Sequence, residues 1–361
     1  MNAARLRVLV VEDSLTSRKR ICEVLSSDPG MEVVGETGDG RSAIELCRDL
    51  RPDAVTMDMM LPVMSGLAAT EYIMAHCPTP ILIVSSSTNR GELFKTYEAL
   101  AAGAVDVLEK PRGDEPEGVW ERGLIEAVRM VARISVITHP RARLGTWGRS
   151  EAGVPAAAAS LRGHDRARCE AIALGASTGG PGAIVEVLRA LPAGFPLPVL
   201  FVLHVGAPFA SAFAEWLDGQ TSMRVAHARD GELLSAVAGR VAMAPPDRHL
   251  VVRDGRLRLV DGPVRHSCRP SVDVLFESMA REIGSGTAAS LLTGIGRDGA
   301  QGLLDIRAAG GLTIAQDEAT SVVYGMPREA AQLGAAELIL PLGEIGPTLA
   351  GLTSAGRGGT P

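Results

Sequence analysis

The sequence predicts an α/β fold made of two doubly wound domains, each with a mostly parallel sheet. Short apolar stretches alternate with amphipathic stretches of helical period in both halves, which is typical of parallel sheets covered by helices on both faces. The chain has 361 residues, enough for two separate hydrophobic cores. Residues 139–168 lose the alternation and are rich in arginine, glycine and proline. We therefore expect domains at residues 5–130 and 169–355, joined by a flexible linker at residues 131–168.

Five stretches of the first domain are expected to form its strands, because each is short, apolar and followed by polar or turn-forming residues. They span residues 7–13, 31–37, 53–58, 81–86 and 105–111. Ser14 is placed to cap a helix that runs to about residue 27. Residues 40–50 and 119–134 predict two further helices.

Polar side chains occur at the carboxyl ends of these strands, where parallel sheets gather their functional groups. These residues are Glu12, Asp13, Asp58, Ser85 and Lys110. Three carboxylates at one edge repel one another unless a hard cation such as Mg2+ lies among them. A cation and a lysine beside a carboxylate would stabilise the charge of an incoming phosphoryl group. The alternative is a solvated acidic edge with an unrelated lysine.

The first domain resembles the receiver domain of bacterial two-component response regulators over its full length. The matching segments are residues 10–13, 57–66, 84–86 and 110–111. The resemblance implies a flavodoxin-like fold, phosphorylation of Asp58 by a chemotaxis-type histidine kinase, and Mg2+ as the cofactor of phosphorylation. It implies as Mg2+ ligands Glu12, Asp13, Asp58 and the Met60 carbonyl, and as switch hydroxyl and phosphate partner Ser85 and Lys110. Val107 departs from the family, which usually has an aromatic residue there.

A second candidate site begins with residues 171–182, which predict a buried strand, a glycine-rich turn and a helix starting near residue 183. Ser177 lies at the tip of the turn in a G-x-S-x-G pattern, which presents a nucleophile between a strand and a helix. The N–H groups from Thr178 to Gly180 are candidates to stabilise an oxyanion. A phosphate or dinucleotide cradle is the alternative, but the glycine spacing matches neither G-x-G-x-x-G nor a P-loop.

Two other strand ends supply the remaining groups of a nucleophilic site. His204 follows the apolar strand 197–203, and Asp298 lies in a glycine-rich turn after the strand 288–293. Ser177, His204 and Asp298 suit the roles of nucleophile, base and orienting acid. The competing histidines, which lie in or beside irregular stretches, are His227, His249 and His266. The order serine, histidine, aspartate differs from that of the α/β-hydrolases.

Residues 169–352 closely resemble the catalytic domain of the chemotaxis response-regulator protein-glutamate methylesterases. The matching segments are residues 175–181, 245–250, 269–276, 292–299 and 315–328. The resemblance implies a Rossmann-like fold, a catalytic triad of Ser177, His204 and Asp298, and ester hydrolysis that needs no cofactor. It implies as substrate the cytoplasmic helical bundle of methyl-accepting chemoreceptors, with glutamine deamidation as a second activity. In the family, the unphosphorylated receiver covers the active-site face and phosphorylation relieves this.

Four residues near the second site depart from the family pattern. The family usually reads Gln-His-Met-Pro around the histidine and has methionine in the later glycine turn, where this chain has Leu203, Val205, Gly206 and Ile295. We expect catalysis to survive because the triad is intact, with a shifted substrate preference or oxyanion geometry. Two alternatives stay open: an inactive esterase fold kept as a phosphorylation-dependent binding module, and a chemosensory pathway other than flagellar chemotaxis.

Composition and missing motifs argue against several other functions. A net charge of −6 and the lack of a helix-turn-helix pattern argue against a DNA-binding regulator, so no nucleic-acid partner is expected. A short-chain dehydrogenase would need Tyr-x-x-x-Lys, yet none of the three tyrosines has a lysine four residues later. The five scattered cysteines favour free thiols in a reducing compartment. With no leader-like or membrane-length apolar run, we expect a cytoplasmic protein without membrane insertion.

Overall fold

The computed structural model describes residues 5–86, 89–111, 113, 116–134, 136 and 169–353. The chain divides into two compact units, Met1–Arg149 and Ser150–Pro361, and each is described by itself. Most of the expected linker at residues 131–168 lies outside the described residues. Its flexibility and the expected domain boundaries therefore stay predictions.

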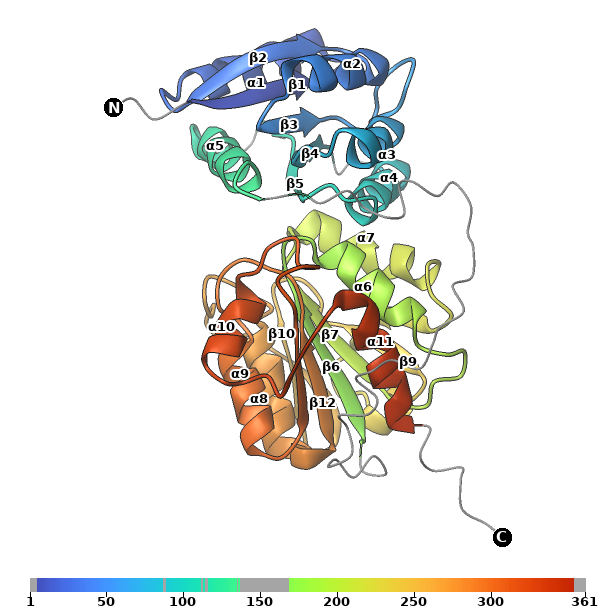
Figure 1. The fold of residues 1–361 in the computed structure, drawn as a ribbon. Coiled ribbons are helices and arrows are strands. Elements are labelled where there is room, and N and C mark those ends of the chain that lie inside the picture. Colours follow the sequence, from blue (N-terminus) through green and yellow to red (C-terminus); the bar gives the residue numbers. More distant parts are fainter. Residues whose placement is uncertain are drawn as a thin grey trace. The chain divides into compact units, whose positions relative to one another are not determined.

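The first unit contains a five-stranded parallel sheet with the strand order β2-β1-β3-β4-β5 (Figure 1). Its elements are β1 (Leu6–Val11), α1 (Leu15–Ser26), β2 (Met31–Thr37), α2 (Gly40–Leu50), β3 (Ala54–Met57), α3 (Gly66–His76), β4 (Ile81–Ser85), α4 (Arg90–Ala101), β5 (Asp106–Glu109) and α5 (Val119–Val131). The central strands β3 and β4 are buried along their whole length, because helices cover both faces of the sheet.

Local contacts in the first unit explain where two of its helices begin. The Ser14 side chain accepts a hydrogen bond from the Ser17 N–H and caps α1, as predicted. Ser65 caps α3 in the same way. A Cβ atom on Gly66 would lie 1.9 Å from the carbonyl oxygen of Asp58. Only glycine fits there, so the start of α3 lies directly against the carboxyl end of β3.

The second unit contains a seven-stranded parallel sheet with the order β14-β13-β12-β6-β7-β9-β8, and a separate antiparallel hairpin, β10-β11. Its elements are β6 (Ala171–Ala176), α6 (Gly180–Arg189), β7 (Val199–Leu203), α7 (Ala207–Asp218), β8 (Arg224–His227), η4 (Leu234–Val237), β9 (Arg240–Met243), β10 (His249–Arg253), β11 (Arg256–Val260), α8 (Val272–Glu282), η5 (Gly284–Gly286), β12 (Thr287–Leu291), α9 (Ala300–Ala308), β13 (Leu312–Gln316), α10 (Met326–Gln332), β14 (Leu338–Leu340) and α11 (Leu342–Ala350). Helices α8, α9 and α10 pack together on one face, and α6 and α11 on the other (Figure 1).

Close packing at the centre of this sheet depends on glycine. Every residue of β6 is buried, and β6 pairs with β12 on one side and β7 on the other. A Cβ atom on Gly175 would lie 2.2 Å from Val272 Cγ1, and one on Gly299 would lie 2.6 Å from the same atom. Two glycines thus let the first turn of α8 lie directly on the end of β6, which determines where the α8 N–H groups point.

The structure confirms the two parallel-sheet α/β domains, with differences in detail. Helix α6 begins at Gly180 rather than near residue 183, because Gly179 takes a left-handed conformation (φ +76°) that starts the helix early. Helix α5 ends at Val131 rather than at residue 134. The β10-β11 hairpin was not predicted. Among the described residues, no helix has the length and apolar character needed to cross a membrane.

Candidate functional site

The acidic edge of the first unit brings the predicted residues together. Glu12 and Asp58 follow β1 and β3 and are buried, at 0% and 2% exposure. Lys110, after β5, places its Nζ atom 2.9 Å from Glu12 and 3.0 Å from Asp58. Asp13 is exposed, and one oxygen from each of the three carboxylates lies within 4.8 Å of the others.

The electrostatics of this edge fit a hard cation. Burial raises the pKa of Glu12 and of Asp58 above the usual values, although the Lys110 charge opposes this. Glu12 Oε2 is buried and makes no hydrogen bond of acceptable geometry, despite the nearby Lys110. A buried carboxylate oxygen that has only the Lys110 ammonium as an ion-pair partner, beside two more carboxylates, matches the all-oxygen ligand set of Mg2+. Met60 donates its N–H to Asp58 Oδ1 over 3.4 Å; the metal contact of the Met60 carbonyl stays a prediction.

The Ser85 hydroxyl is held by a residue that the sequence did not suggest, Glu92 on α4. Ser85 Oγ donates to Glu92 Oε1 over 2.8 Å, and the Thr96 hydroxyl donates to Ser85 Oγ over 3.2 Å. Glu92 is 5% exposed and also accepts from the Ser86 N–H and hydroxyl. A switch hydroxyl can turn toward a phosphoryl group on Asp58 only if it leaves this carboxylate.

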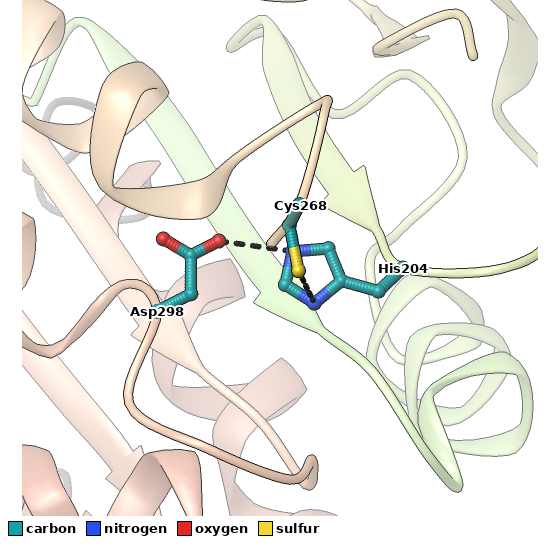
Figure 2. A group of neighbouring side chains, drawn as sticks. All are labelled: His204, Cys268 and Asp298. Carbon is teal, nitrogen blue, oxygen red and sulfur yellow. Dashed lines mark hydrogen bonds and ion pairs between the residues drawn. The ribbon is translucent and has the colours of Figure 1, made fainter. Parts of the chain in front are cut away.

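The second unit places the three predicted catalytic residues at neighbouring strand ends. Ser177 follows β6 and His204 follows β7; these strands pair in parallel, and the His204 N–H donates to the Ala176 carbonyl over 3.0 Å. Asp298 comes from the turn after β12, on the other side of β6. Its Oδ2 atom lies 2.9 Å from His204 Nε2 (Figure 2). The oxygen is an ion-pair partner rather than an in-line acceptor, since Nε2 makes no hydrogen bond of acceptable geometry.

Cys268, which the sequence analysis did not place at this site, contacts the other nitrogen of the same ring. Its Sγ atom lies 3.6 Å from His204 Nδ1 (Figure 2). Within the described part of the chain, no hydrogen bond joins the Ser177 hydroxyl to His204. The structure therefore has one nitrogen of the His204 ring beside Asp298 and the other beside the Cys268 thiol.

Asp298 is held by the start of helix α8. Its carboxylate accepts from the Ser271 hydroxyl (2.7 Å), the Val272 N–H (2.7 Å) and the Asp273 N–H (3.1 Å). Burial by itself would raise the pKa of Asp298, but the contact with His204 and these donors lower it below the usual value. Asp298 thus stays charged although it is only 2% exposed.

His249, one of the competing histidines, contacts Ser271, which in turn holds Asp298. Its Nδ1 atom accepts from the Ser271 N–H over 3.1 Å, and Nε2 lies 3.0 Å from the Pro263 carbonyl. This explains the 245–250 motif, because His249 holds the backbone that presents Ser271 to Asp298. His266 contacts Asp273 over 3.1 Å, and His227 contacts the Ser211 carbonyl over 3.3 Å.

The turn at the nucleophile is fixed mainly through its backbone. The Ser177 N–H donates to the Thr293 carbonyl, and the Thr293 hydroxyl donates to the Thr178 carbonyl. The Gly180 N–H donates to the Ser177 carbonyl over 2.7 Å, so the prediction of Gly180 as an oxyanion donor is wrong. Among the described residues, the Gly179 N–H has no acceptor. It is the open donor beside Ser177, with Thr178 between them.

Two contacts raise the pKa of His204 enough to outweigh its burial. Burial favours the neutral ring and lowers the pKa, but Asp298 and Cys268 stabilise the charged ring and raise it from the usual 6.5 to about 9. Both contacts therefore favour the protonated form of the ring in this resting arrangement. The ring must lose that proton before it can act as a base.

Comparison with known proteins matches both units. Residues 8–116 match the response regulator receiver domain, and residues 172–349 match the CheB methylesterase family. A protein from Anaeromyxobacter dehalogenans, named protein-glutamate methylesterase/protein-glutamine glutaminase 2, is 43% identical and covers 96% of this chain and 97% of its own length. A Nitrosospira multiformis protein of the same family name is 40% identical, covering 97% of each chain. The chain belongs to the protein-glutamate methylesterase/protein-glutamine glutaminase family.

Among solved structures, the CheB methylesterase catalytic domain of Thermotoga maritima is 34% identical, with a TM-score of 0.49, and matches 51% of this chain and 99% of that one. Membership in the methylesterase family confirms the resemblance seen in the sequence. It also confirms the combination of a receiver domain with a methylesterase domain in one chain.

The departures from the methylesterase family pattern fall in different environments. Leu203 is 2% exposed and packs against the start of α6, where a Cβ atom on Gly180 would lie 2.7 Å from it. Leu203 therefore acts on the packing under the serine turn rather than on the surface. Ile295 is 43% exposed, so this departure changes the surface beside the site.

Mg2+ is expected to stabilise the first unit. A cation held by the acidic edge at a hundred times its dissociation constant should raise the free energy of unfolding by about 2.7 kcal/mol. Thermal unfolding of the full chain with and without Mg2+ measures this. Asp13→Asn should remove most of the gain, while Asp49→Asn, a change at an exposed residue of α2, should leave it. An equal gain in both variants would contradict the site.

Glu92→Gln is expected to favour phosphorylation of Asp58. The change keeps the side-chain shape but removes the charge that holds Ser85 and Ser86, and a hydrogen bond to a charged group is worth about 1.5–3 kcal/mol. Loss of part of this hydrogen-bond free energy should raise the fraction of chains phosphorylated at Asp58 roughly three- to tenfold when the phosphodonor is limiting. Gel separation of the phosphorylated chain measures it. Glu98→Gln, on the exposed side of α4, is the control, and an unchanged fraction in Glu92→Gln would reject the idea.

The His204 ring is expected to titrate near pH 9 rather than near its usual pKa of 6.5. Because Asp298 and Cys268 both raise this pKa, Asp298→Asn and Cys268→Ser should each move the titration to lower pH. NMR of imidazole-labelled protein across pH 5–10 follows it. Cys169→Ser should change nothing, and a ring that titrates near 6.5 in the unmodified chain would contradict the assignment.

Proposed function

We propose that this chain is a phosphorylation-controlled serine esterase. It hydrolyses glutamate γ-methyl esters on methyl-accepting chemoreceptors, and deamidates specific glutamines there, in a chemotaxis or chemosensory-like pathway. The observation that carries the proposal is the convergence of Ser177, His204 and Asp298 at the ends of three adjacent strands, in a chain whose relatives bear this activity in their names. Free thiols and the family assignment support a cytoplasmic location.

The roles follow from which atoms face each other. Asp298 faces His204 Nε2, so Nδ1 is the nitrogen left to take the proton of the Ser177 hydroxyl. The serine oxygen then bonds to the γ-carbonyl carbon, and the C–OCH3 bond breaks as the imidazolium returns its proton to form methanol. Water, deprotonated by His204, cleaves the acyl-enzyme and leaves glutamate. A glutamine substrate loses ammonia in place of methanol. No step requires a cofactor.

The oxyanion formed in both halves of the reaction needs donors close to Ser177. The Gly179 N–H lacks an acceptor among the described residues and stands at the start of α6, where the helix dipole favours negative charge. We assign it as a donor together with Thr178. One such donor is typically worth about 2.7–4 kcal/mol in the transition state.

The receiver supplies the control. Asp58 is the proposed phosphoacceptor, a histidine kinase the phosphodonor, and Mg2+, when bound by Glu12, Asp13 and Asp58, neutralises charge on the transferred group. Lys110, already 3.0 Å from Asp58, pairs with the phosphoryl oxygens. Ser85 must leave Glu92 to contact them. Loss of the hydrogen bond between Ser85 and Glu92 is the conformational step that couples phosphorylation to the rest of the receiver.

Methanol release from methylated receptor fragments tests both the esterase activity and its control by phosphorylation. Release should depend on Ser177, with Ser177→Ala lowering the rate by roughly 1,000-fold or more. A small-molecule phosphodonor with Mg2+ should raise the rate in the unmodified chain but not in Asp58→Asn. Ser211→Ala, which changes an exposed serine of α7 in the same unit, is the control and should behave as the unmodified chain.

Two results would overturn the proposal. Release that persists in Ser177→Ala would exclude the serine mechanism. Complete phosphorylation of Asp58 without any release would favour the binding-module alternative, in which the altered residues around His204 have ended catalysis.

A further inference from the structure

Cys268 adds a soft ligand to the catalytic pair. Its thiol lies 3.6 Å from His204 Nδ1, and one donor atom each from His204, Cys268 and Asp298 lies within 4.8 Å of the others (Figure 2). All five cysteines are free. Asp298 is 3% and His204 13% exposed at the side chain, and Cys268 is half-buried. The cluster is thus shielded but reachable from solvent.

The loop that carries Cys268 is held in an uncommon conformation. His266 and Ser267, the two residues before it, have φ values of +50° and +62°. Non-glycine residues rarely adopt this conformation because of backbone strain, so surrounding contacts must hold them. The Arg265 and Cys268 backbones exchange two hydrogen bonds across them, and His266 Nε2 lies 3.1 Å from Asp273 Oδ2. The fold therefore fixes the thiol beside the imidazole rather than leaving it there by chance.

One nitrogen, one sulfur and one carboxylate oxygen make the donor set of a thiophilic d10 cation. Zn2+ binds such ligands at about 2.0–2.3 Å, so the ligand atoms of a tetrahedral site are roughly 3.3–3.7 Å apart. The contacts of 2.9 Å and 3.6 Å around His204 are close to this range. They involve different ring nitrogens, so a shared cation requires the ring or the thiol to turn. His204 Nε2, which has no in-line hydrogen-bond partner, is the nitrogen available for that.

We propose that Cys268, His204 and Asp298 form a binding site for a thiophilic divalent cation of the Zn2+ class, and that occupancy switches the esterase off. A thiolate and a carboxylate balance the two positive charges, and Cys268 releases its proton as the metal binds. The acidic edge of the receiver offers oxygen alone and suits Mg2+, so the two sites separate hard from soft cations by donor type.

Inhibition follows because the metal would coordinate groups that the proposed reaction requires. A cation on the imidazole removes the lone pair that must accept the Ser177 proton, and it also occupies the carboxylate that orients the ring. Binding rests on the geometry alone, whereas inhibition rests also on the proposed esterase function. The two are therefore tested separately.

Co2+ is the probe for binding, because a cobalt–thiolate bond has a charge-transfer absorption that oxygen and nitrogen ligands lack. The reduced full-length chain is titrated with Co2+ in excess Mg2+, which occupies the receiver site. We expect the thiolate band to saturate at one equivalent and to disappear when Zn2+ is added. Cys268→Ser should abolish the band and weaken Zn2+ binding by about tenfold to 100-fold. Cys169→Ser, which removes another half-buried thiol of the same unit, should retain both.

Absence of the band in the unmodified chain, or its survival in Cys268→Ser, overturns the site whether or not the chain is an esterase. Inhibition is measured as methanol release with and without Zn2+, each variant relative to its own metal-free rate. We expect Zn2+ to inhibit the unmodified chain and Cys169→Ser reversibly, with recovery on chelation, and Cys268→Ser to need at least about tenfold more Zn2+. Equal inhibition of all three variants overturns the regulatory role.

Discussion

The buried charge of Asp298 is the constraint on which the catalytic unit depends. An isolated carboxylate at 2% exposure would be strongly destabilising or would take up a proton. Three donors from the first turn of α8 remove that cost, and they reach Asp298 because Gly175 and Gly299 let α8 approach the end of β6. His249 in turn holds Ser271. The separate sequence motifs of this unit therefore converge on a single requirement, which is to keep one carboxylate charged beside His204.

Both units have buried carboxylates at one edge of a sheet and stabilise them in different ways. In both, parallel strands bring polar residues to one edge of a sheet. The receiver compensates its buried carboxylates with one cationic side chain, Lys110, which lies 2.9 Å from Glu12 and 3.0 Å from Asp58 and suits the proposed site for a metal and a phosphoryl group. The methylesterase unit compensates Asp298 with fixed backbone and hydroxyl donors. Such donors cannot move away, so they suit a residue that has to orient a ring.

The sequence predicted the parts of this architecture that follow from periodicity. Apolar strands with polar ends predicted Glu12, Asp58 and Lys110 in one unit and Ser177, His204 and Asp298 in the other. The structure places each set at neighbouring strand ends, where Lys110 pairs with Glu12 and Asp58, and His204 with Asp298. The missed residues are Glu92, His249, Cys268 and Ser271. They reach the sites from a helix face, from the start of β10 and from the loop before α8, and no local pattern encodes those paths. The error at Gly180 has the same origin, since the early start of α6 at a left-handed Gly179 uses that N–H inside the turn.

Both nitrogens of the His204 ring already have partners in the resting site. Asp298 lies at one nitrogen, and Cys268 lies at the nitrogen that Ser177 requires. Both contacts favour the charged ring, and a charged ring cannot accept the serine proton. In the proposed mechanism, the serine hydroxyl replaces the thiol at Nδ1 as the ring becomes neutral. The thiol is held at Nδ1 by a loop with two residues of positive φ, so the loop that carries Cys268 determines which partner this nitrogen meets in the resting site.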